Sequence, residues 1–70
     1  MKRVEVASSV IRAAGYDPHT KTLEVELLDG HVYVYRGVPA VVYRDLMNAA
    51  SVGQYFAHFI KTTYPCTRVE

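Results

Sequence analysis

The stretch that decides the fold is LEVELLDGHVYVYR, residues 23–36, in which apolar and polar side chains alternate on both sides of Asp29-Gly30. An Asp-Gly dipeptide between two alternating segments is typical of a β-hairpin closed by a two-residue type I′ turn. Counting outward from that turn pairs Val25 with Val34. We therefore predict a β-hairpin whose tip is Asp29-Gly30.

The predicted pairing gives the hairpin two different faces, because successive side chains of a strand point to opposite sides. One face is aliphatic and needs a core to cover it: Leu23, Val25, Leu27, Val32 and Val34. The other face carries Glu24, Glu26, Tyr33 and Tyr35. We expect this second face to lie open, so a function displayed on the sheet would be found there.

An earlier segment, SSVIRAAGY at residues 8–16, is expected to add a strand before the hairpin. The turn that follows it, DPHT at residues 17–20, has Asp first and Pro second, which a type I turn prefers. Setting Tyr16 opposite Thr22 places Arg12 and Tyr16 on the open face. The sequence thus predicts a three-stranded antiparallel meander.

After the meander the apolar period changes from that of a strand to that of a helix. Gly37 ends the last strand, and Pro39 suits a first helical turn because its missing N–H would have no partner there. Apolar positions in 40–50 follow helical spacing. Ser51 followed by Gln54 is a capping-box pattern that begins a second helix. We therefore predict an α+β fold, a three-stranded antiparallel meander followed by two α-helices packed on the aliphatic sheet face (β-β-β-α-α).

The chain has 70 residues and is expected to form a single domain, residues 1–70. Its core should span about 8–64. Residues 2–7 are an extended lead-in that could fray. Residues 65–70 are expected to be a partly ordered tail, with pairing to an exposed sheet edge as the alternative.

The composition excludes several classes of protein. Eight basic and seven acidic side chains give a net charge of +1, which argues against a protein held to nucleic acid chiefly by counterion release. No stretch approaches the roughly 18 apolar residues of a membrane span, and the N-terminus lacks an apolar signal core. We expect a cytoplasmic location without membrane association, and a single Cys66 that forms no internal disulfide.

No motif for catalysis, metal or cofactor binding is present in the sequence. His19, His31 and His58 fall in different predicted elements, without the short spacings that metal ligands need. Glu24 and Glu26 share a strand face, but no pocket-forming segment is predicted to desolvate them. The sequence therefore predicts no enzyme and no cofactor.

Tyr33 and Tyr35 are the residues most suggestive of a function. Tyrosines at i and i+2 project from one strand face about 7 Å apart, and several RNA-binding domains stack unpaired bases on such pairs. Tyrosine is also a favoured strand residue, and cross-strand contacts alone could explain the pair. The candidate ligand-binding residues are Tyr33, Tyr35, Tyr16, Arg12 and Arg36.

An ordered set of short motifs spans most of the chain: Ser8-Ser9, Gly15-Tyr16-Asp17, Leu23-x-Val25-x-Leu27, Gly30, Tyr33-x-Tyr35, Val38-Pro39, Tyr43, Ser51-x-Gly53, Tyr55-Phe56, Ile60 and Tyr64. This set resembles the KTSC domain, which occurs at the C-terminus of some lysyl-tRNA synthetases and as small stand-alone bacterial proteins. The hallmark of that family is the Tyr-x-Tyr. The chain departs from the pattern at Ala57, where an asparagine commonly follows the Tyr-Phe pair.

The resemblance implies a small α+β domain without an established activity, and attachment to a synthetase suggests RNA as a ligand. We therefore expect a non-catalytic binding module for single-stranded RNA or tRNA that uses the tyrosine-bearing sheet face. The alternative is a protein-protein interaction or self-association module that uses the same face or a sheet edge.

Overall fold

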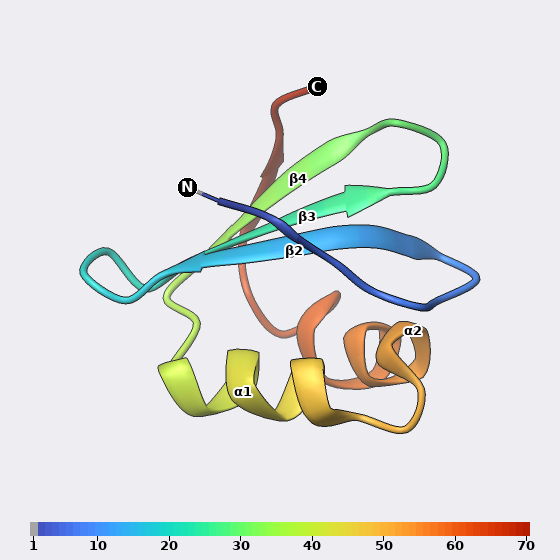
Figure 1. Cartoon of the computed structure of the whole chain (residues 1–70). Coiled ribbons are helices and arrows are strands. Elements are labelled where there is room, and N and C mark those ends of the chain that lie inside the picture. The colour runs from blue at the N-terminus through green and yellow to red at the C-terminus, as the bar shows by residue number, and fades with distance from the viewer. Residues whose placement is uncertain (1) are drawn as a thin grey trace.

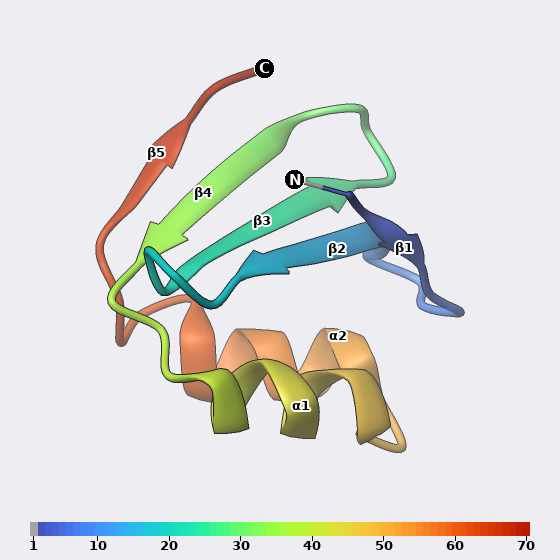
Figure 2. The ribbon, with the colours of Figure 1, turned by 60° about the vertical axis from the view of Figure 1, so that its left-hand side comes forward.

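The computed structural model describes residues 2–70 and places five antiparallel strands in the order β1-β2-β3-β4-β5 (Figure 1). The strands are β1 (Val4–Glu5), β2 (Ile11–Asp17), β3 (Thr22–Leu27), β4 (Val32–Arg36) and β5 (Cys66–Arg68). The helices are α1 (Ala40–Asn48) and α2 (Val52–Tyr55), and the π-helical turn η1 (Phe56–Ile60) continues α2. Figure 2 shows the helical segments on one side of the sheet. The α+β class is confirmed, but the sheet has five strands rather than the predicted three.

The two additional strands form the edges of the sheet. At the N-terminal edge β1 runs so close to β2 that a methyl group on Gly15 would lie 2.6 Å from the carbonyl oxygen of Lys2. At the C-terminal edge β5 pairs with β4, and the carbonyl oxygen of Pro65 accepts a hydrogen bond from the amide of Arg36 at 3.1 Å. The lead-in and the tail are therefore paired strands, and Pro65 precedes the β5 ladder without interrupting it.

The hairpin between β3 and β4 closes with three residues instead of two. The amide of Leu27 donates to the carbonyl of His31 at 2.9 Å, and the amide of Gly30 donates to the carbonyl of Leu27 at 3.0 Å. Gly30 has a positive φ of 93°, the left-handed conformation that ends a three-residue loop built on a type I turn. The predicted type I′ turn is wrong, and the β4 register shifts by one residue.

The pairing of β2 with β3 also differs from the prediction. Ile11 lies opposite Leu27, but a β-bulge follows, and beyond it Tyr16 lies opposite Leu23 rather than Thr22. Because a bulge adds one residue to one strand, every side chain after it changes face. Tyr16 consequently faces the helices instead of the open side.

The core joins side chains from the sheet and from the helical segments. Its fully or nearly fully buried members are Ile11, Leu23, Val25, Tyr35, Val38, Leu46, Val52, Phe56 and Ile60. The second helix begins where the capping pattern predicted, since the side chain of Ser51 accepts the amide of Gln54 at 3.3 Å. Within residues 2–70 no helix is both long enough and apolar enough to cross a membrane.

Candidate functional site

The two tyrosines of β4 lie on the helix-facing side of the sheet. Val25 pairs with Tyr33 and Leu23 pairs with Tyr35, and directly paired residues share a face. The prediction that Tyr33 and Tyr35 lie on the open face is therefore wrong. Their neighbours Val32 and Val34 lie on the opposite side of the sheet, across from Glu26 and Glu24. Val32 is nevertheless buried there, at 1% exposed.

Tyr35 is a buried member of the core. It is 3% exposed, and its ring meets that of Phe56 edge to face, with centroids 5.5 Å apart and planes at 86°. Burial raises the pKa of Tyr35 to about 12, and the neighbouring Cys66 thiol and Tyr33 phenol add to the shift. Cys66 lies directly opposite Tyr35 on β5. The Tyr35 hydroxyl therefore stays protonated over the physiological pH range.

Tyr33 is half-buried and stands on the wall of a pocket of about 280 Å³. The pocket lies between the sheet and η1 and is lined by Val10, Leu27, Tyr33, Tyr35, Phe56, Lys61 and Cys66. Its walls are mainly apolar and aromatic. The polar groups that reach it are two phenols, one thiol and the ammonium group of Lys61. This combination is typical of a site that takes a small apolar or aromatic group.

The π-helical turn brings Phe56 and Lys61 to the same pocket. The amide of Lys61 donates to the carbonyl of Phe56 at 2.9 Å, which is the i to i+5 bond of a π-helix. Such turns are rare in proteins, but those that occur are often found at functional sites. Lys61 follows directly after this turn and is the one charged residue that lines the pocket.

The other three candidate residues do not reach the pocket. Tyr16 stacks on Tyr43 with ring centroids 5.2 Å apart, and its hydroxyl donates to the carbonyl of Val38. Arg12 lies on the open face, and Arg36 donates to the Thr67 hydroxyl at 2.9 Å. Of the five predicted binding residues, the structure brings only Tyr33 and Tyr35 together.

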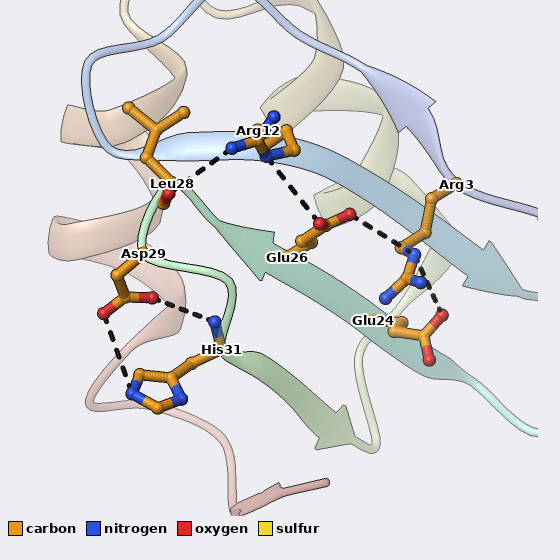
Figure 3. A network of polar contacts seen from close by, with 7 residues as sticks. All are labelled: Arg3, Arg12, Glu24, Glu26, Leu28, Asp29 and His31. Atoms are coloured by element: carbon orange, nitrogen blue, oxygen red, sulfur yellow. Dashed lines mark hydrogen bonds and ion pairs between the residues drawn. The ribbon is translucent and has the colours of Figure 1, made fainter. Parts of the chain in front are cut away.

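The open face of the sheet is covered by a network of ion pairs (Figure 3). The guanidinium Nε of Arg3 lies 3.8 Å from carboxylate oxygens of both Glu24 and Glu26, and Arg12 lies 3.7 Å from Glu26. Arg12 also donates to the carbonyl of Leu28 at 3.4 Å. Arg3 is thus shared by the two carboxylates, and Glu26 has Arg12 beside it as well. This face is a paired polar surface without exposed tyrosine rings.

Several residues of the pocket were not predicted from the sequence. Val10, Phe56, Lys61 and Cys66 come from segments far from the hairpin, and only Phe56 carried a signal, as part of the apolar stripe of the second helix. Within residues 2–70 no group of three or more histidine, cysteine or carboxylate side chains is placed to hold a metal ion.

Comparisons with known proteins identify the family. Residues 7–64 match the model of the KTSC domain. The crystal structure of a KTSC domain protein from Yersinia pestis matches with a TM-score of 0.93 at 36% identity, covering 99% of this chain and 97% of that chain. An uncharacterised protein of Stutzerimonas stutzeri is 44% identical over 61 residues, 87% of this chain and 86% of the relative. A lysine–tRNA ligase of a Nostoc species is 49% identical over 53 residues, which are 76% of this chain and 9% of the ligase.

Proposed function

The chain belongs to the KTSC domain family, and we propose that it is a non-catalytic binding module that takes an unpaired base of an RNA into the pocket beside Tyr33. The observation that carries this proposal is the half-buried Tyr33 ring on the wall of a pocket of about 280 Å³. Stacking of one base on an aromatic side chain is worth about 1–3 kcal/mol. The binding surface is thus the helix-facing pocket and not the open sheet face.

The size of the pocket supports a single planar group as its occupant. Ligand pockets usually measure about 300–1,000 Å³, so a pocket of about 280 Å³ falls just below that range. Three of its seven lining residues, Tyr33, Tyr35 and Phe56, are aromatic. A base in a duplex cannot enter such a pocket, because its faces are covered by its neighbours in the stack. The ligand is therefore a single-stranded or looped RNA.

Transfer RNA is the first RNA to test. Two relatives of this chain, at 49% identity, are lysine–tRNA ligases, in which the matched segment is 9% of the protein. A domain attached to an enzyme that acts on tRNA supports a tRNA ligand by association. The loops and the unpaired 3′ end of tRNA supply the accessible bases that the pocket requires.

The chemistry of the lining supports binding without catalysis. The pocket residues, all within residues 2–70, include no histidine and no carboxylate that could act as a general base. Tyr35, with its pKa raised to about 12, is a hydrogen-bond donor at neutral pH and a poor base. Cys66 is exposed, with no base on the pocket wall to activate it.

Fluorescence anisotropy with labelled single-stranded RNA, duplex RNA and tRNA tests this function. Tyr33→Leu removes the ring but keeps an apolar side chain, so the domain should fold and lose at least tenfold in affinity for single-stranded RNA. Phe59→Leu is the matched control, because Phe59 is 57% exposed on η1 and lies outside the pocket. Equal affinity of Tyr33→Leu and wild type, or a preference for duplex, would contradict the proposal.

A protein partner is the second candidate occupant, and one observation favours it. Val10 and Leu28 are each 45% exposed, and the amide of Leu28 donates to the carbonyl of Val10 at 3.0 Å, so the two lie side by side. Val10 also lines the pocket. An apolar edge of this kind suits a protein side chain, or a second copy of the domain. Sizing of the purified protein distinguishes the copy, since a dimer that ignores RNA supports this candidate.

A further inference from the structure

We infer that the ligand of the pocket is anionic, a nucleotide whose base occupies the apolar pocket and whose phosphate lies against Lys61, with Arg68 as a second contact. The inference rests on the proposed function and specifies its ligand. It assigns a phosphate-binding role to two residues that no motif in the sequence singles out.

The lining of the pocket carries a single charge, which is positive. Lys61 is the one charged residue in the lining. After Asp45 the charged side chains are those of Lys61, Arg68 and the last residue, Glu70. Of the acidic residues near the tyrosine strand, Glu24 and Glu26 lie on the opposite face of the sheet, where Arg3 and Arg12 pair with them. Glu70, the last residue, lies at the far end of the β4–β5 pairing, where its backbone bonds to that of Val32. In a chain with a net charge of only +1, the charge that lines the pocket is therefore positive.

Register places Arg68 at the same rim. Arg68 lies directly opposite Tyr33 on β5, and directly paired residues of an antiparallel ladder project from one face. Both Arg68 and Lys61 are exposed, and neither takes part in an ion pair within residues 2–70. Their side chains are free to reach an anion at the pocket mouth.

Apolar walls with a cationic rim match a nucleotide better than a neutral aromatic side chain. A neutral aromatic group would fill the pocket and leave both cations unused. A nucleotide places its base against Tyr33 and its phosphate against the ammonium and guanidinium groups, which bind phosphate oxygens through charge-assisted hydrogen bonds. Because the two parts of the ligand contact different residues, they can be tested separately.

The salt dependence of RNA binding provides that test. Each phosphate contact on a single strand contributes about −0.7 to the slope of log affinity against log salt, so two contacts predict a slope of about −1.4. For a short fluorescein-labelled oligouridylate, Lys61→Gln should bring the slope to about −0.7. Lys61→Arg should restore the wild-type slope because it keeps the charge. Lys2→Gln, which removes an equally exposed lysine from the other end of the chain, should leave the slope unchanged.

The outcomes distinguish the inference from the function on which it rests. If Tyr33→Leu abolishes binding but Lys61→Gln keeps the wild-type slope, the base pocket stands and the phosphate contact is wrong. If Lys2→Gln makes the salt dependence as much less steep as Lys61→Gln does, the charge acts without a specific site. The inference is then also overturned. If no RNA binds the wild type, both the proposed function and this inference fail.

Discussion

Leu23 lies directly opposite Tyr35 in the ladder between β3 and β4, and this pairing determines which side of the sheet holds the tyrosines. Leu23 is completely buried beneath the helical segments, so its partner is buried with it. A pairing shifted by one residue would have exposed both β4 tyrosines on the open face. The position of the pocket therefore follows from the length of the hairpin loop.

Truncation of neighbouring β4 residues tests this face assignment. Tyr35→Ala should lower the free energy of unfolding by about 3–5 kcal/mol, because it leaves a cavity against Phe56. Val34→Ala, on the open face, should lower it by about 1 kcal/mol or less. Tyr35→Phe keeps the ring and should unfold close to wild type. Urea denaturation followed by circular dichroism measures all three, and a larger loss for Val34→Ala than for Tyr35→Ala would contradict the register.

Substitution of Gly30 tests the loop itself. Gly30 has a φ of 93°, and nothing lies within 4 Å of a methyl group placed on it. The cost of Gly30→Val is therefore backbone strain without a steric clash, about 1–3 kcal/mol. Gly30→Asn should cost less, because asparagine tolerates left-handed backbone better than a β-branched residue does. Equal urea midpoints for Gly30→Val and wild type would show that residue 30 does not need a left-handed backbone, and would contradict the three-residue loop.

The sequence predicts the order of the central elements because local patterns encode it. Strand alternation, the change to helical spacing after Gly37 and the Ser51 cap each depend on neighbours a few residues apart. The faces are not encoded in the same way. Both alternating sets of β4, the valines and the tyrosines, are suited to a core, and Asp-Gly serves two-residue and three-residue loops alike. A one-residue error in the loop then inverts the whole strand.

The pocket and the edge strands could not be predicted because they depend on contacts between distant segments. Gly15 leaves room for the backbone of Lys2 just before β1, where a methyl group would lie 2.6 Å from the Lys2 carbonyl oxygen. β5 brings Cys66 beside Tyr35, a residue 31 positions earlier in the chain. No spacing within one element reports such a contact, so the sequence indicates Tyr33 and Tyr35 as candidate residues but not the residues that surround them.

The raised pKa of Tyr35 predicts a loss of stability at high pH. In the unfolded chain this phenol titrates near 10, whereas in the folded domain its pKa is about 12. Between these values the unfolded state has released its proton and the folded state has not, so stability falls as the pH rises from about 10 to about 12. Below pH 10 the contribution is fully present.

Tyr35→Phe isolates this effect from the titration of the other tyrosines and the lysines. The difference in urea midpoint between wild type and Tyr35→Phe should be constant below pH 10. At higher pH the midpoint of the wild type should fall relative to that of Tyr35→Phe. A difference that stays constant up to pH 12 would show that burial does not hold this phenol protonated.

We propose that RNA binds in the helix-facing pocket and not on the open sheet face. The most direct measurement is an NMR titration of the ¹⁵N-labelled protein with short single-stranded RNA. We expect amide shift changes grouped around Tyr33, Phe56, Lys61 and Cys66, which line the pocket. Shift changes grouped instead around Arg3 and Arg12 of the ion-paired face, or none at saturating RNA, would contradict it.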